Sequence, residues 1–172
     1  GIKGFKVDFM NRDDQPLDDF VYRIAEAAAQ HRLLLDLHGM YKPTGLNRTY
    51  PNIVNFEGVH GLETVKWTPI DVADQVVYDV TVPFIRMGAG PMDYTQGAML
   101  NRTRVTFRVL NSLPMSPGTR CRQLAEYVIF ESPLNMMCDS PNNYRKEPEC
   151  TRFIASVPTV WSQTLPLDGK IG

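Results

Sequence analysis

The chain has 172 residues, and its 18 basic against 19 acidic side chains give a formal net charge of −1. This balance argues against a nucleic-acid-binding protein, which usually carries a clustered basic excess. Hydrophobic residues make up 43% and charged residues 22% of the chain, which excludes disorder as the main state. No segment approaches the roughly 18 apolar residues of a membrane-spanning helix, so we expect no membrane partner.

The first 37 residues predict a strand, a helix and a second strand. Residues 4–9 alternate apolar and polar side chains, and residues 17–31 place apolar side chains at three- and four-residue spacing. Residues 33–37 (LLLDL) form a short apolar run typical of a strand buried on both faces. This order predicts a parallel strand–helix–strand unit.

A long irregular stretch follows from His38 to about Gly61, rich in Gly, Pro and Asn. Ordered loops of this length in compact domains usually carry function. We therefore expect a site loop here, with a third strand near residues 58–64.

The second half of the chain continues the alternation. Residues 68–76 predict the start of a helix, residues 77–84 a β-branched strand, residues 119–130 a second long helix, and residues 154–161 a final strand. About five strands alternating with helices predict an α/β fold with a mainly parallel sheet.

The chain starts within a strand-like run, has no initiator Met, and ends at residues 167–172 without a finished element. We therefore expect a segment of a longer protein, and the lack of a signal peptide then says nothing about compartment. The three cysteines form no CxxC pair and have no histidine at zinc spacing, so we expect free thiols.

Polar residues stand where the predicted strands end. Asp8 lies near the end of the first strand, and His38 directly follows the second. Ligands of parallel α/β folds lie outside the carboxyl ends of the strands, so both are candidate site residues. A solvated or capping carboxylate and a structural histidine are the alternatives.

Glu57 and Glu63 lie six residues apart in the predicted site loop. In an extended segment this even spacing places both carboxylates on one face, where they repel unless a cation or a shared proton separates them. An oxygen-liganded ion such as Ca²⁺ suits such a pair, although two carboxylates cannot supply six to eight ligands. Surface acids are the alternative.

Two carboxylates on different strand ends are what glycoside hydrolysis requires, one ionised and one protonated. Lys6 close to Asp8 favours the charged form of that carboxylate, while crowding by Glu57 would favour a proton on Glu63. A bound cation would oppose the second tendency, so the sequence leaves the net shift of Glu63 open. No GxSxG, Walker, HExxH or dinucleotide-binding motif is present.

Longer strings carry a resemblance to a known family. Residues 42–52 (KPTGLNRTYPN), followed by Glu57 and Glu63, closely resemble glycoside hydrolase family 97. Residues 83–94 and residues 131–161 resemble the later barrel strands of the same family. The resemblance therefore extends over essentially the whole chain, in order.

The resemblance implies a (β/α)₈ TIM barrel of which residues 1–172 form roughly strands four to eight. In such enzymes an N-terminal β-sandwich and the first barrel strands precede this segment, and a C-terminal β-sandwich follows it. The expected domain is thus a partial catalytic barrel, and the isolated segment is expected to be inactive.

The family has two branches that place the second carboxylate differently. The inverting α-glucosidase branch carries Glu directly after the histidine matching His38 and Gly where Asp8 stands. This chain has Gly39 and Asp8 at these positions, so it resembles the retaining branch. The resemblance then makes Asp8 the nucleophile and Glu63 the general acid and base, and implies that Lys6 and His38 contact sugar hydroxyls.

The resemblance also matches Glu57 and Glu63 to ligands of Ca²⁺, with at least one further ligand from outside the segment. It implies a calcium-dependent retaining α-galactosidase that acts on oligosaccharides. A β-L-arabinopyranosidase, an α-glucosidase and an inactive sugar-binding fragment are the alternatives. Family habit further implies a periplasmic or secreted bacterial protein.

Overall fold

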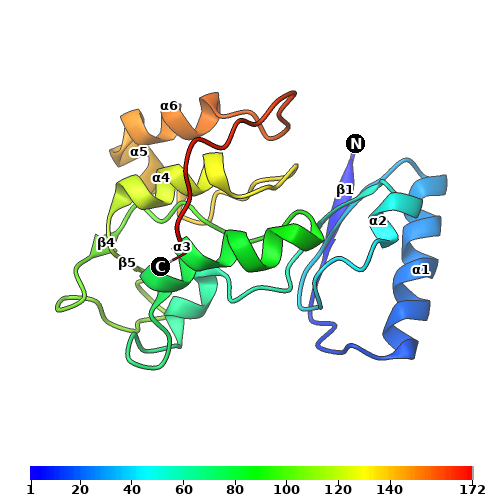
Figure 1. The fold of residues 1–172 in the computed structure, drawn as a ribbon, viewed down its shortest axis with the longest axis horizontal. Helices are drawn as coiled ribbons and strands as arrows, with labels where there is room; N and C mark the ends of the chain where they lie inside the picture. Colours follow the sequence, from blue (N-terminus) through cyan, green and yellow to red (C-terminus); the bar gives the residue numbers. More distant parts are fainter. Residues whose placement is uncertain (172) are drawn as a thin grey trace.

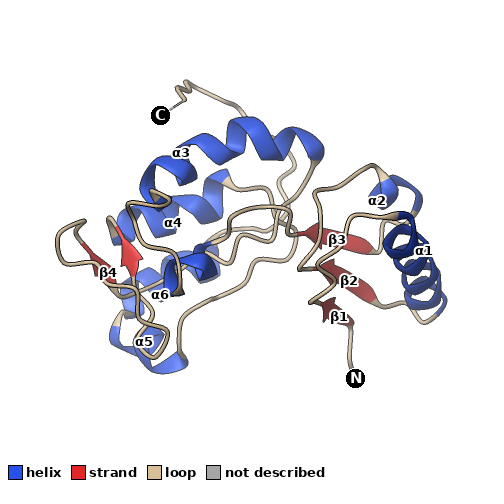
Figure 2. Cartoon of the chain, turned by 90° about the horizontal axis from the view of Figure 1, so that it is seen from below, coloured by secondary structure: helices blue, strands red, loops and turns tan. Residues whose placement is uncertain are grey.

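The computed structural model describes residues 1–171, and Gly172, the last residue of the predicted domain, lies outside the described residues. A parallel three-stranded sheet opens the fold, in the order β1 (Gly4–Val7), β2 (Leu34–Leu37) and β3 (Ile53–Phe56). Figure 2 shows the three strands side by side with helix α1 (Gln15–Gln30) against them. The predicted strand–helix–strand unit is therefore confirmed.

Helix α1 forms because its apolar side chains share one face. Leu17, Val21, Ala25 and Ala28 are buried at spacings of three and four residues and belong to one core cluster with residues of β2 and β3. The side chain of Asp14 accepts a hydrogen bond from the backbone N–H of Leu17 and caps the helix.

The third strand does not lie where the sequence predicted it. Strand β3 lies inside the stretch expected to be irregular, after the short helix α2 (Leu46–Thr49). Within the predicted position, residues 62–66 instead form the 3₁₀ helix η1 (Leu62–Lys66). The run of β3 is only four residues long and is interrupted by Asn55, so its β signal was weak.

The strand predicted at residues 77–84 is wrong, because these residues belong to helix α3 (Gln75–Arg86). Its buried positions, Gln75, Asp79, Val82 and Arg86, recur at helical spacing, and only one of the four is apolar. Asp74 caps the N-terminus, so the helix begins at Gln75, within the range of residues 68–76 predicted for its start. Tertiary burial overrides the β preference of the valines.

Beyond the three-stranded sheet, two irregular segments are hydrogen-bonded to β3 and to each other. The N–H of Asp93 donates to the carbonyl of Phe56 at 2.9 Å, and the N–H of Met92 donates to the carbonyl of Glu131 at 3.0 Å. The side chain of Asn55 bonds to the Ser132 hydroxyl at 2.8 Å. Residues 91–94 therefore lie beside β3, and residues 130–132 lie beside residues 91–94.

Arg86 forms hydrogen bonds with the backbone at the end of β3 and at the start of residues 91–94. It is the buried last residue of α3, directly before the 3₁₀ helix η2 (Met87–Ala89). It donates to five backbone carbonyls, those of Phe56, Glu57, Gly58, Gly90 and Pro91. A planar guanidinium with five N–H donors suits this role.

The remaining helices pack on the other side of the molecule (Figure 1). They are α4 (Arg120–Ile129), α5 (Pro141–Lys146) and α6 (Pro148–Ser156), beside the two-residue strands β4 (Asn101–Arg102) and β5 (Ser116–Pro117). Helix α4 was predicted. The final strand expected at residues 154–161 is wrong, because Ile154 is a buried residue of α6 and residues 157–161 are irregular.

A buried polar cluster joins α3 to α4. Asp79 accepts hydrogen bonds from Gln75 and from the Tyr94 hydroxyl, and Arg122 donates to it at 2.5 Å. Glu126 faces the same cluster with a side chain only 4% exposed, and its Oε2 atom has no hydrogen-bond partner. Burial, and then repulsion by Asp79, raise the pKa of Glu126 to about 9.

Within residues 1–171 the three cysteines are free thiols, as predicted. No helix in this range is long and apolar enough to cross a membrane.

Candidate active site

Charged side chains gather at the carboxyl end of the parallel sheet. Lys6 on β1 pairs in register with Asp36 on β2, so their side chains lie on the same face. The Lys6 ammonium lies 2.5 Å from an Asp93 carboxylate oxygen and 3.9 Å from an Asp36 oxygen. Lys6 thus bonds to Asp93, whereas the sequence analysis considered only its effect on the nearby Asp8.

His38 connects this group to the two glutamates. Its Nδ1 lies 2.8 Å from Asp93, and its Nε2 lies 3.2 Å from Glu57 and 3.2 Å from Glu63. Burial alone would lower the pKa of His38, but the hydrogen bonds to Asp93 and Glu63 outweigh it and raise the pKa to about 10. The imidazolium therefore serves as a positive charge amid three carboxylates.

The two glutamates have opposite environments. Burial raises the pKa of Glu57, which also accepts a hydrogen bond from the Gly39 N–H at 2.7 Å. The hydrogen bond from His38 lowers the pKa of Glu63, despite a smaller opposing effect of burial. Crowding by Glu57 therefore does not leave a proton on Glu63 in this arrangement.

Glu57 and Glu63 meet at His38 for a different reason from the one predicted. The segment between them is not extended, because Gly58 has a φ of +47° and Glu63 lies in the 3₁₀ helix η1. The chain turns back after β3. Glu57, which directly follows β3, and Glu63, which lies in η1, therefore both approach the imidazole of His38.

Asp8 lies at the rim of this network. It is exposed, and its Oδ1 accepts a hydrogen bond from the N–H of Phe9 at 2.6 Å. Gly39, with a φ of +63°, is packed so closely that a Cβ there would lie 2.9 Å from this oxygen and 2.8 Å from the Phe9 nitrogen. Asp8 and a side chain at position 39 would therefore compete for the same space.

Sequence reasoning missed Asp36 and treated Asp93 as equally consistent with a turn. Asp36 is 1% exposed, and burial together with repulsion by Asp93 raises its pKa to about 7. Burial alone would raise the pKa of Asp93, but hydrogen bonds from His38 and Lys6 lower it. The available signal was an acid inside the apolar run LLLDL, because an unpaired charge is rarely buried.

The donor atoms of His38, Glu57 and Glu63 lie within 4.8 Å of one another. The glutamate oxygens suit a hard cation such as Ca²⁺, whereas the histidine nitrogen does not. Two carboxylates also leave the coordination incomplete. The two glutamates are therefore suitable calcium ligands, but they are too few to complete the coordination of the ion.

A family profile described as Glycoside hydrolase 97 matches residues 1–59. Over all 172 residues the chain is 63% identical to a protein of Bacteroides thetaiotaomicron named retaining alpha-galactosidase. The chain is therefore similar to glycoside hydrolase family 97 over its whole length. It is also 30% identical, again over its whole length, to a probable retaining alpha-galactosidase of Streptomyces bingchenggensis.

Solved structures of this family agree with the fold. A family 97 enzyme of Pseudoalteromonas sp. strain K8 in complex with acarbose superposes with a TM-score of 0.76 at 33% identity, over 92% of this chain and 23% of that one. The same enzyme's E480Q form in complex with panose gives 0.76 at 32% identity, with the same coverage. The chain spans about a quarter of the length of the curated relatives, 26% and 24%.

Proposed function

We propose that residues 1–172 are part of the catalytic domain of a retaining α-galactosidase. The observation that carries the proposal is the convergence of Lys6, His38, Glu57 and Glu63 at the carboxyl end of the sheet, with Asp8 at its rim. The relatives named retaining alpha-galactosidase supply the reaction and the sugar.

We further propose that these residues form the later strands of a (β/α)₈ barrel. Strands β1, β2 and β3 are parallel neighbours, and backbone hydrogen bonds place residues 91–94 beside β3 and residues 130–132 beside those. Five adjacent segments in chain order, separated mostly by helices, are what half of such a barrel contains. The candidate site at the carboxyl ends of the strands fits the position of barrel active sites.

The proposed reaction has two steps. In the first, the Asp8 carboxylate attacks the anomeric carbon while Glu63 donates a proton to the departing glycosidic oxygen, so a glycosyl ester forms as the carbon–oxygen bond breaks. In the second, Glu63 takes a proton from water, whose oxygen attacks the anomeric carbon and releases Asp8. Two inversions give net retention.

The surrounding residues would position the sugar. Lys6 is fixed by Asp93 yet remains 31% exposed, so its ammonium can donate to a sugar hydroxyl. His38 lowers the pKa of Glu63, which favours the carboxylate needed as a base in the second step. The acid form needed in the first step requires His38 to release Glu63, for example by donating to a sugar hydroxyl instead.

A test of the chemistry is the anomer released from p-nitrophenyl α-galactoside by the intact protein, followed by proton NMR. We expect the α-anomer first, and Asp8→Asn should lower turnover by roughly 10³-fold or more. Asp13→Asn, an exposed acid on the same loop, is the matched control. Initial release of the β-anomer, or turnover near the wild-type rate in Asp8→Asn, would contradict the proposal.

We also propose that Glu57 and Glu63 hold a Ca²⁺ ion together with ligands from outside these residues. Such an ion would fix the two carboxylates in place and offset their mutual repulsion. Calorimetric titration of the chelator-treated intact protein should show Ca²⁺ binding that Glu57→Gln weakens at least about tenfold and the exposed Glu26→Gln on α1 leaves unchanged. Equal affinity in all three proteins would show that Glu57 does not bind the ion.

A further inference from the structure

A buried carboxyl group without a partner lies on the middle strand of the sheet, beside the candidate active site. Asp36 is 1% exposed, and neither of its carboxyl oxygens has a hydrogen-bond partner among the described residues. The reaction proposed above does not use this group. Because an unpartnered charge is very costly in the interior of a protein, such a carboxyl group needs an explanation.

The neighbouring strand carries a further unpartnered acceptor. Asn55 on β3 pairs in register with Asp36, so the two side chains lie on the same face of the sheet. The Asn55 amide nitrogen donates to the Ser132 hydroxyl and to the Leu134 carbonyl, whereas its Oδ1 is buried without a partner among the described residues. Three buried oxygens therefore share one face and lack a donor. A proton on Asp36 supplies a donor, because a protonated carboxyl group has one O–H and keeps an acceptor oxygen.

The charged groups that face Asp36 come from three parts of the chain. They are Lys6 on β1, His38 at the end of β2 and Asp93 in the segment beside β3, while Asn55 on β3 is uncharged. Burial, and then repulsion by Asp93, raise the pKa of Asp36 to about 7, although Lys6 and His38 act in the opposite direction. The surroundings therefore favour an uncharged Asp36 below that pH.

The position of Lys6 depends on the charge of Asp36. The Lys6 ammonium lies 2.5 Å from an Asp93 oxygen but 3.9 Å from an Asp36 oxygen, which is too far for a hydrogen bond. An ionised Asp36 would attract the ammonium toward the interior, because the Asp36 side chain has no exposed surface and that of Lys6 is 31% exposed. With Asp36 uncharged, the ammonium stays with Asp93 at the surface of the site.

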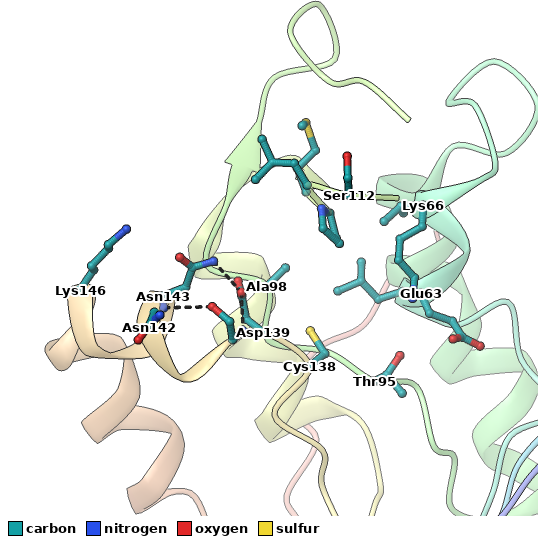
Figure 3. A pocket seen from close by; sticks show the side chains of 16 residues that line it. Glu63, Lys66, Thr95, Ala98, Ser112, Cys138, Asp139, Asn142, Asn143 and Lys146 are labelled. Atoms are coloured by element: carbon teal, nitrogen blue, oxygen red, sulfur yellow. Dashed lines mark hydrogen bonds between the residues drawn. The ribbon is translucent and has the colours of Figure 1, made fainter. Parts of the chain in front are cut away.

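We propose that Asp36 is a positioning residue that works as an uncharged carboxylic acid and so keeps the Lys6 ammonium directed at a hydroxyl group of the sugar. The inference rests on the proposed function, which gives Lys6 that contact. Figure 3 shows the pocket that opens at Glu63, with a lining drawn from η1, residues 95–115 and residues 138–146. Asp36 lies elsewhere, fully buried on β2, and it acts through Lys6 without touching the substrate.

The charge of Asp36 can be measured without any turnover. In infrared difference spectra of the intact protein, carbon-13 labelling of aspartate at Cγ separates the C=O stretch of a protonated aspartate from that of a protonated glutamate such as Glu126. We expect a protonated-aspartate band at pH 6 that is absent from Asp36→Asn and that fades as the pH rises through about 7. Wild-type spectra at pH 6 that match those of Asp36→Asn in this region would overturn the proposal.

The positioning role is tested by kcat/KM for p-nitrophenyl α-galactoside between pH 5.5 and 8.5. Asp36→Asn keeps an uncharged N–H donor at every pH, whereas wild-type Asp36 loses its proton over this range. The ratio of kcat/KM in the variant to that in wild type should therefore rise at least about threefold, whatever its value at pH 5.5. The ratio for Asp71→Asn, an exposed acid, should stay constant as the matched control.

A second comparison asks whether the effect passes through Lys6. In a Lys6→Met background, Asp36→Asn should give a ratio that does not change with pH, because the ammonium that Asp36 positions is gone. An equal rise without Lys6, or a constant ratio in Asp36→Asn alone, would overturn the positioning role while leaving the proposed reaction intact.

Asp36→Ser, which keeps a hydroxyl donor in a smaller side chain, should show the same rising ratio. If neither Asp36→Asn nor Asp36→Ser folds, the proposal also fails, because an uncharged donor is what it assigns to this position. Wild-type protein that hydrolyses no α-galactoside would instead overturn the proposed function, and the infrared band would still report the charge of Asp36.

Discussion

Replacing the buried carboxyl of Glu126 by an amide should make the protein more stable at alkaline pH. Glu126 is 4% exposed, lies opposite Asp79, and leaves one oxygen without a partner. Its pKa is raised from the ordinary 4.5 to about 9, first by burial and then by Asp79. Between these values the folded state binds a proton that the unfolded state has released.

The sign follows from this linkage. Because the folded state binds more protons, the free energy of unfolding falls as the pH rises through the window from 4.5 to about 9. The limiting slope is about 1.4 kcal/mol per pH unit, so three units give up to about 4 kcal/mol. Because Glu126 and Asp79 interact and share the effect of pH, we expect about 2–4 kcal/mol between pH 5.5 and 8.5.

Glu126→Gln removes the titrating group and keeps the size. Urea unfolding of the intact protein at several pH values should show an advantage of the variant that grows by about 2–4 kcal/mol from pH 5.5 to 8.5. Glu26→Gln, on the exposed face of α1, serves as control and should follow the wild type at each pH. A constant difference between Glu126→Gln and wild type over this range would refute the reasoning.

Arg86→Lys should lower the free energy of unfolding by about 2–4 kcal/mol, because one ammonium cannot reach five carbonyls; thermal unfolding measures it, and a loss below about 0.5 kcal/mol would contradict the role of the guanidinium. Gly39→Ala should cost about 1–3 kcal/mol through its positive φ and, by displacing Asp8, should lower kcat; unchanged stability and kcat would show that the site relaxes freely. Asn55→Ala, which breaks the bonds between β3 and residues 132–134, should destabilise by about 1–3 kcal/mol in the same unfolding assay, and a neutral result would mean that these bonds do not hold the two segments together.

The local elements that the sequence predicted well are those whose burial follows a simple period. The apolar face of α1 and the run of β2, which is apolar except for Asp36, have such patterns. Helix α3 does not, since three of its four buried residues are polar and bond to one another or to backbone carbonyls. A period counted on apolar residues alone misses a helix that buries Gln75, Asp79 and Arg86.

In the candidate site, too, some features could be predicted from the sequence and others could not. Position at a strand end was enough to single out Asp8 and His38 as candidates. The pair Glu57 and Glu63 was proposed from a spacing argument that assumed an extended segment, and the chain turns at Gly58 instead. The hydrogen-bond partners within the site could not be predicted from the sequence, because Asp93 approaches His38 and Lys6 only in the folded chain. Charge partners at a separation of 55 or 87 residues leave no local pattern to read.

The tight packing of Gly39 against Asp8 also restricts the order in which mutations can accumulate. A chain that acquires a glutamate at position 39 while it still carries Asp8 must place two carboxylates where there is room for one. The passage between the two arrangements that the family resemblance implies would therefore run through a protein with glycine at both positions, which lacks either version of the second carboxylate. Such an intermediate would lose the proposed activity, so gene duplication, which keeps one active copy, is a natural setting for the change.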